Sequence, residues 1–190
     1  RPRRGRCALF MPHRAGAGMG AGALSLGSIA EYGLIGDCRS AALVSRAGSI
    51  DWLCWPRFDS PSCFAALLGG HEHGRWLIAP KAPATVRRAY RDGTMVLETV
   101  FATSEGEVAL IDFMPVDDGP VDDGPGGVVR ILEGRRGRVA MTMELVLRFD
   151  YGAAVPWVTR LPDGHGIRAV AGPDQVVLRS PVPLHGQGLT

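Results

Sequence analysis

The sequence predicts a mainly β protein, a large antiparallel β-sandwich with one short helix near residues 61–68. Its 26 glycines and 14 prolines in 190 residues favour short strands joined by turns over long helices. Turn signals such as Asp92-Gly93 recur about every 8–12 residues, a spacing typical of all-β sandwiches. Residues 141–150 also alternate, which places five apolar side chains on one face of a strand: Met141, Met143, Leu145, Leu147 and Phe149.

The expected strands follow one another as antiparallel neighbours joined by short turns. Apolar or alternating runs between turn residues predict strands at 41–45, 50–54, 76–79, 85–91, 95–101, 108–113, 128–132, 141–150, 155–160, 167–171 and 175–179. Residues 28–36 are expected to form an extended lead-in. Gly48 permits the positive φ of a tight turn at 46–49, and residues 133–137 (EGRRG) are predicted to be a charged turn.

The one expected helix follows an exposed loop. Trp55-Pro56 ends the preceding strand, because proline has no N–H to donate and holds its predecessor extended. Ser60 is a candidate N-cap and Pro61 suits the first helical position. Gly69-Gly70 then predicts the end of the helix at Leu68.

Cysteine and histidine spacing does not predict a disulfide framework, a metal site or a cofactor site. Three of the four cysteines (Cys38, Cys54 and Cys63) fall in the predicted domain, and we expect Cys54 and Cys63 to be small buried apolar residues. His71 and His73 are expected to be solvated. Residues 116–125 duplicate VDDGP, and their aspartate pairs suggest Ca²⁺, but the spacing does not match an EF-hand, so a solvated loop is expected.

Residues 1–27 differ in composition from the rest and are predicted to be a disordered tail. Five arginines precede the first acidic residue, Glu31; without them, 16 basic residues face 19 acidic ones, a net charge of −3. An arginine arm for nucleic acid is the alternative, but no interleaved aromatic residues support it. No run of about 18 apolar residues predicts a membrane span, and no signal peptide is apparent, so we expect a cytoplasmic protein.

Several longer strings of the sequence resemble one known family. These are GSIDWLCWPRFDSPSCFAALLGG, HGRWLIAP, YRDGTMVLET, DFMP, RILEGRRGRVAMTMELVLRFDYG and VPWV, spread from residue 28 to the C-terminus. They are similar to the N-terminal β-sandwich domain of bacterial family 15 glycoside hydrolases, the glucoamylase-like and trehalase-like proteins. The resemblance implies a sandwich of the galactose-mutarotase-like supersandwich type.

The same resemblance implies where the chemistry of this family lies. The sandwich is followed there by an (α/α)6 barrel whose two glutamates act as general acid and general base of an inverting hydrolysis. A chain of 190 residues has no room for that barrel. We therefore expect residues 28–190 to be an incomplete, non-catalytic domain that packs on the barrel and is inactive alone, with α-glucan or trehalose as possible ligands. The alternative is a free-standing carbohydrate-binding module.

The candidate site is the loop Trp55, Arg57, Phe58 and Asp59, read as an interface or a substrate rim; a purely structural role is the alternative. Arg57 is suited to a planar pair with a carboxylate such as Asp59. Asp51 and Asp59 flank the Trp-rich segment and are a candidate catalytic pair, but strand alternation is expected to point Asp51 and Trp52 to opposite faces. No catalytic residue is therefore assigned in this chain.

Overall fold

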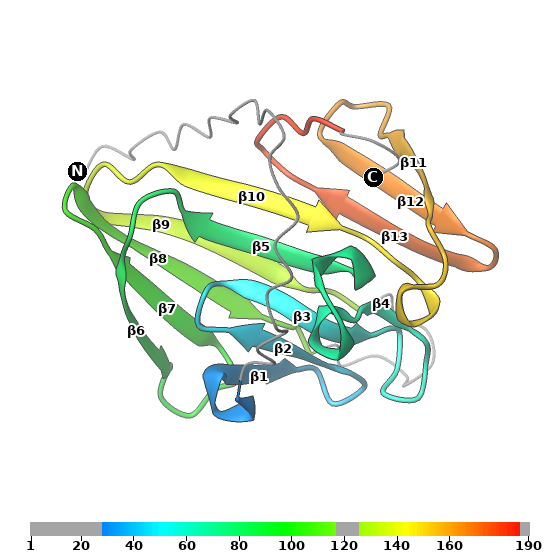
Figure 1. Ribbon diagram of the computed structural model, residues 1–190, viewed down its shortest axis with the longest axis horizontal. Coiled ribbons are helices and arrows are strands. Elements are labelled where there is room, and N and C mark those ends of the chain that lie inside the picture. Colours follow the sequence, from blue (N-terminus) through cyan, green and yellow to red (C-terminus); the bar gives the residue numbers. More distant parts are fainter. Residues whose placement is uncertain (1–27, 117–125, 187–190) are drawn as a thin grey trace.

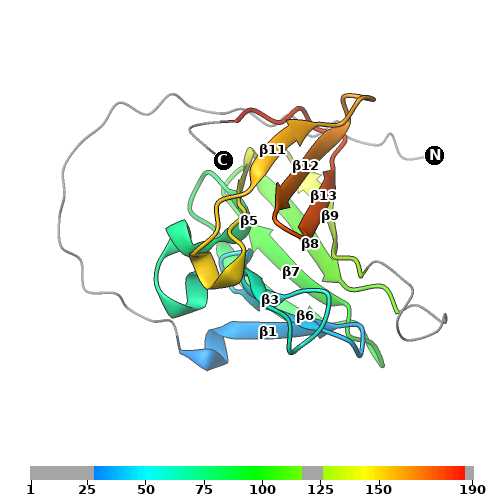
Figure 2. The same cartoon turned by 90° about the vertical axis from the view of Figure 1, so that its right-hand side faces the viewer.

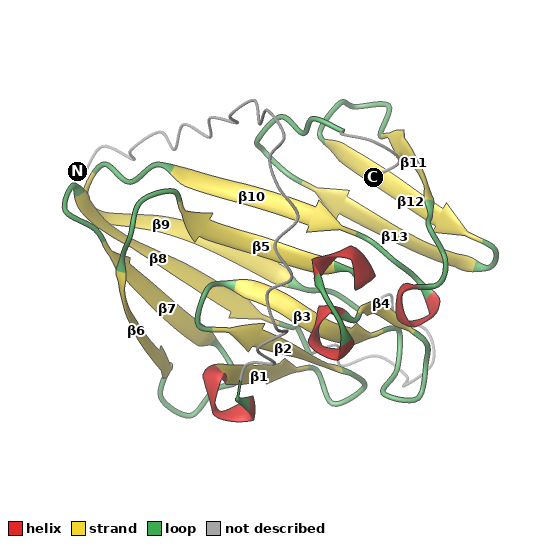
Figure 3. Ribbon diagram, in the orientation of Figure 1, coloured by secondary structure: helices red, strands yellow, loops and turns green. Residues whose placement is uncertain are grey.

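The computed structural model describes residues 28–116 and 126–186, and in these residues the chain is mostly strand, as predicted (Figure 3). The strands are β1 (Tyr32–Gly36), β2 (Ala41–Ser45), β3 (Ser49–Cys54), β4 (Ser62–Phe64), β5 (Arg75–Pro80), β6 (Thr85–Tyr90), β7 (Leu97–Ala102), β8 (Gly106–Phe113), β9 (Val129–Gly137), β10 (Met141–Val146), β11 (Trp157–Arg160), β12 (Gly166–Ala171) and β13 (Asp174–Arg179). The 3-10 helices are η1 (Ile29–Glu31), η2 (Ala66–Leu68), η3 (His71–His73) and η4 (Asp150–Gly152).

The strands form three antiparallel sheets (Figure 1). The first sheet has the order β1-β2-β3-β5-β10, with β4 paired to β3. The second sheet has the order β6-β7-β8-β9, and the third has the order β11-β12-β13. Within the described residues, no strand of the third sheet is hydrogen-bonded to a strand of the other two. This arrangement agrees with the predicted β-sandwich.

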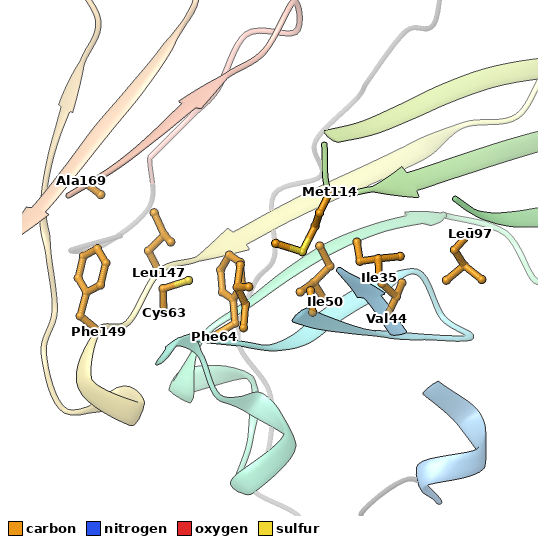
Figure 4. Packing of buried hydrophobic residues seen from close by; sticks show 12 residues of the cluster. Ile35, Val44, Ile50, Cys63, Phe64, Leu97, Met114, Leu147, Phe149 and Ala169 are labelled. Carbon is orange, nitrogen blue, oxygen red and sulfur yellow. The ribbon is translucent and has the colours of Figure 1, made fainter. Parts of the chain in front are cut away.

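The hydrophobic core lies between the sheets and forms two clusters. The larger cluster joins residues of all three sheets: Ile35, Val44 and Ile50 come from the first, Leu97 from the second and Ala169 from the third (Figure 4). The smaller cluster packs Ile78 and Met141 of the first sheet against Phe101, Val108 and Leu110 of the second. The strand expected at 95–101 begins only at Leu97, whereas Met95 lies before β7 and is 46% exposed.

A buried ion pair within the second sheet also supplies hydrogen bonds to the first sheet. Asp112 on β8 and Arg130 on β9 are cross-strand partners, and both side chains are 0% exposed. Arg130 donates to both carboxylate oxygens of Asp112, at 2.8 and 3.2 Å. The same guanidinium donates to the Gly48 carbonyl at 2.8 Å and to the Trp76 carbonyl, and it lies 5.2 Å from the Trp76 ring centroid. Arg130 therefore holds the second sheet on the turn and strand of the first.

The outer edges of the same two sheets are joined by polar side chains of β6. The Tyr90 hydroxyl accepts the Leu34 N–H at 2.8 Å and donates to the Leu34 carbonyl at 2.8 Å. Arg88 donates to the carbonyls of Glu31 and Val44, at 2.9 and 3.0 Å. Side chains of β6 thus bind backbone groups at the edge of the first sheet, and they join the two sheets here although β6 is not paired with a strand of the first sheet.

The helix expected near residues 61–68 is corrected by the structure. Residues 62–64 form β4, which pairs with β3 through Leu53–Phe64 and Cys54–Ser62, and only Ala66–Leu68 is a short 3-10 turn. Ser62, Cys63 and Phe64 are all buried, and strand pairing supplies backbone partners at a buried site. Tertiary contacts thus override the local helix signals.

Two further sequence expectations are also corrected. Residues 133–137 are not a turn but the continuation of β9, which pairs with β8 as far as Gly137–Gly106, with a register shift after Glu107. The strand expected at 141–150 ends at Val146, and the chain then bends through η4. Leu147 and Phe149 are nevertheless buried in the larger cluster, so the predicted apolar face extends beyond the strand itself.

Candidate functional site

The candidate loop forms a tight turn between β3 and β4. The Ser60 hydroxyl accepts the Arg57 N–H at 3.2 Å, and the Ser60 N–H donates to the Arg57 carbonyl at 3.1 Å. Inside this turn, Arg57 Nε lies 3.0 Å from Asp59 Oδ1, as the sequence suggested. Phe58 between them is 62% exposed. The loop therefore presents a cation, an aromatic ring and an anion side by side at the surface.

The turn at residues 37–40 contacts this loop through a backbone hydrogen bond. The carboxylate of buried Asp37 accepts the backbone N–H groups of Arg39 and Ser40 at 2.9 and 2.8 Å. The Arg39 carbonyl in turn accepts the Phe58 N–H at 3.0 Å. The two turns border an open hollow of about 250 Å³ lined by Cys38, Arg39, Arg57, Phe58 and Asp59. Sequence reasoning missed Cys38 and Arg39; the Asp37-to-Ser40 spacing, typical of an Asx turn, was the available signal.

Trp55 differs from the other three residues of the candidate site. Its ring is half-buried and packs against the larger core cluster. A Cβ atom built on Gly126 would lie 2.4 Å from Trp55 Nε1, so the backbone at Gly126 covers the indole closely. Trp55 therefore anchors the loop, whereas Arg57, Phe58 and Asp59 are the exposed members.

The carboxylates of the candidate catalytic pair, Asp51 and Asp59, each have hydrogen-bond partners nearby. The hydrogen bond from Arg57 lowers the pKa of Asp59 below its ordinary value. Asp51 accepts hydrogen bonds from the Tyr32 and Ser49 hydroxyls, at 3.0 and 2.5 Å. A general acid needs a raised pKa at neutral pH, so the environment of Asp59 is opposite to that requirement.

A β-bulge corrects one step of the sequence argument. The register between β2 and β3 passes from Leu43–Trp52 to Val44–Ile50, so Asp51 is an extra residue on β3. Asp51 and Trp52 are both partly exposed, while Ile50 and Leu53 on either side are 0% exposed. The strict alternation that was expected to separate Asp51 from Trp52 therefore fails at this point.

The Tyr32–Asp51 hydrogen bond predicts a pH dependence of stability. Burial and the neighbouring Asp51 raise the pKa of Tyr32 to about 12 from 10.0. Between these two values the unfolded state has lost the phenolic proton while the folded state retains it, so this contribution is complete below pH 10 and is lost as the pH rises toward 12. We expect the wild-type chain to lose more stability than Tyr32→Phe between pH 9.5 and 11.5 in urea titrations. Parallel pH curves for the two proteins would contradict this role.

The other candidate ligands and thiols occupy separate places. His73 Nδ1 accepts the Gly70 N–H at 3.2 Å, and His71 and His73 both lie in η3. Among the described residues, no three His, Cys, Asp or Glu side chains are placed to hold a metal ion. Cys54 and Cys63 are buried free thiols, as predicted. The aspartates of the VDDGP duplication, together with the tail at 1–27 that contains Cys7, lie outside the described residues.

The described part of the chain contains no helix that is long and apolar enough to cross a membrane.

Comparisons with known proteins agree on one family. A family model described as trehalase-like, N-terminal, matches residues 20–184. The trehalase of Mycolicibacterium smegmatis is 41% identical over 87 residues, covering 44% of this chain and 13% of that protein. The trehalase of Thermoplasma volcanium is 31% identical over 160 residues (82% and 25%), and trehalase 1 of Sulfolobus acidocaldarius is 34% identical over 133 residues (70% and 22%).

No solved structure gives a significant match. The chain spans a quarter or less of the length of these three relatives. The match over residues 20–184 nevertheless covers most of the chain. The chain therefore belongs to the trehalase-like N-terminal domain family.

Proposed function

We propose that this chain is the non-catalytic N-terminal domain of a family 15 glycosidase that hydrolyses the α-glucosidic bond of trehalose. The observation that carries the proposal is the match of residues 20–184 to a domain described as N-terminal, with relatives named trehalase in which it spans a quarter or less of the length. In this proposal the acid and base of hydrolysis belong to the remainder of the polypeptide.

The chemistry of the described residues supports this division of labour. Glycoside hydrolysis needs two carboxyl groups that flank the scissile bond, one of them with a raised pKa. Asp59 is paired with Arg57 and has a lowered pKa, and Asp51 is held by two hydroxyl groups. Neither carboxylate has the environment of a general acid.

The exposed loop is the second part of the proposal, in which Arg57, Phe58 and Asp59 border the substrate entrance of the catalytic remainder. The loop is anchored by Trp55, which packs on the core, and by the Arg39 carbonyl, which accepts the Phe58 N–H, so its backbone is held at two points. Asp59 orients the Arg57 guanidinium, whose planar set of donors suits a contact with a carboxylate or a sugar hydroxyl. A rigid, exposed loop of this kind suits an interface better than a core contact.

A hybrid enzyme tests both parts of the proposal. Residues 28–184 would replace the matching region of the Thermoplasma volcanium trehalase, and glucose release from trehalose would be measured. We expect the 190-residue chain alone to release no glucose and the hybrid to release it. Arg57→Ala in the hybrid is expected to lower kcat/KM several-fold, on the order of 1 kcal/mol of transition-state stabilisation.

Arg87→Ala is the matched control for this substitution, because Arg87 is exposed to a similar degree and also pairs with a carboxylate, but lies on the second sheet. Ion pairs at the surface contribute little to stability, so Tm is expected to change little in either variant. Glucose release by the isolated chain would overturn the non-catalytic assignment. Equal activity of Arg57→Ala and Arg87→Ala would remove the loop from the substrate entrance, and α-glucan binding by the isolated chain would favour a free-standing carbohydrate-binding module.

A further inference from the structure

A second surface, formed around η4 and the third sheet, exposes large apolar side chains. Tyr151, Val155 and Trp157 fall within seven consecutive residues and are 47%, 49% and 77% exposed. Val177 on β13 is 45% exposed. We call these four residues the Trp157 face. Trp157 has the highest exposure of the large apolar side chains in the described residues, and an exposed apolar cluster of this kind is typical of an interaction site.

The register of the third sheet explains why Trp157 and Val177 lie outside. Val158, Ala169 and Val176 are cross-strand partners in a row, and all three belong to or pack on the larger core cluster. Because neighbouring residues on a strand point to opposite faces, Trp157 and Val177 belong to the outer face. Figure 2 shows η4 and β11 turned toward the viewer at this end of the molecule. The third sheet thus covers the core with one face, and its other face is not covered by the residues that the structure describes.

The backbone before β11 fixes the loop that carries Tyr151. Asp150, Tyr151 and Gly152 have consecutive positive φ values of 50°, 55° and 100°. Non-glycine residues rarely adopt this left-handed conformation, so the surrounding structure must fix it. Two backbone hydrogen bonds between Phe149 and Ala154, at 2.9 and 3.0 Å, close the loop, and the Tyr151 ring lies 6.1 Å from that of Trp52. Tyr151 is therefore presented in a defined orientation.

We propose that the Trp157 face is the docking surface for an apolar patch on the remainder of the trehalase polypeptide. The inference rests on the proposed function, since it takes the remainder from the relatives, of which this chain spans 13–25%. An exposed tryptophan beside aliphatic side chains, with Thr159 and Arg168 on the same outer face, has the composition of an interface centre with a polar rim. The exposed aliphatic side chains of Val155 and Val177 suit an apolar partner surface.

A binding experiment in two parts tests this surface. The full 190-residue chain would be titrated with the Thermoplasma volcanium trehalase that lacks its own matching region. We expect Trp157→Ala to raise the Kd on the order of tenfold or more, as truncation of a central interface aromatic does. Met95→Ala is the matched control: Met95 is 46% exposed, but it follows β6 in the second sheet, and its substitution is expected to leave the Kd unchanged.

Hydrogen exchange in the hybrid enzyme covers the case in which that shortened trehalase does not fold. Amides of β11 and β13 are expected to exchange more slowly in the hybrid than in the isolated chain, and Trp157→Ala is expected to remove this protection. Equal behaviour of Trp157→Ala and Met95→Ala in an active hybrid would overturn the docking surface while the proposed function stands. An inactive hybrid would count against the proposed function instead.

Two other occupants are distinguished with the isolated chain. Quenching of tryptophan fluorescence by maltotriose that is lost in Trp157→Ala would assign the face to sugar binding. A dimer in size-exclusion chromatography that Trp157→Ala dissociates would assign it to a second copy. Either result would overturn docking of the polypeptide remainder.

Discussion

Replacement of Arg130 by methionine is expected to lower the free energy of unfolding by about 3–5 kcal/mol, because it leaves the Asp112 carboxylate buried without a cation. Both side chains are 0% exposed, and Arg130 donates a hydrogen bond to each carboxylate oxygen of Asp112. The substitution also removes the hydrogen bonds that Arg130 donates to the Gly48 and Trp76 carbonyls. The measurement is urea denaturation followed by tryptophan fluorescence.

The double variant Arg130→Met, Asp112→Leu separates the cost of a stranded charge from the loss of packing. It removes both charges at once, and replacing a whole buried pair by apolar side chains is often neutral or stabilising. We therefore expect the double variant to recover much of the stability that Arg130→Met loses. If the double variant is as unstable as the single one, the hydrogen bonds to Gly48 and Trp76, rather than the ion pair, hold the sheets together.

Local patterns predicted a strand well where it has its own alternation and its own flanking turn residues. Residues 41–45 form β2 as predicted, and the turn after it has Gly48 at a φ of +82°. The prediction of a turn at 133–137 failed because glycine and charged residues are typical of turns, whereas pairing with β8 decides the conformation of this segment. Propensity at such a position is overridden by a partner strand that the local sequence does not reveal.

The candidate site was predictable to the extent that its contacts are local. Arg57 and Asp59 are two residues apart, and their ion pair follows from that spacing in a turn. The burial of Trp55 was not predictable, because it depends on Gly126, which is 71 positions away in the sequence. The Trp157 face was likewise missed: strand alternation places Trp157 on one face of β11, but only the packing of Ala169 against the core shows which face is covered.

Gly48→Ala is expected to lower the free energy of unfolding by roughly 2–5 kcal/mol, because the turn conformation and the close approach of β5 both oppose an added methyl group. Its φ of +82° is unfavourable for alanine by roughly 1–2 kcal/mol. A Cβ atom there would also lie 2.3 Å from the Ile78 carbonyl oxygen and 3.1 Å from the Phe101 ring, and overpacking of this kind costs typically about 1–3 kcal/mol. The Gly48 carbonyl accepts hydrogen bonds from the Ile78 N–H and from the Arg130 guanidinium, so any backbone shift disturbs these two bonds as well.

Gly93→Ala isolates the backbone part of this effect. Gly93 has a similar φ of +68°, but no atom lies within 4 Å of the position that its Cβ would take. We expect Gly93→Ala to cost about 1–2 kcal/mol and Gly48→Ala to exceed it by the cost of the collision with Ile78 and Phe101. Equal losses for the two variants in urea denaturation would mean that the turn moves away from β5 at little cost. The sheets would then be held chiefly by the core clusters rather than by the close approach of this turn, because the turn would have been free to relax.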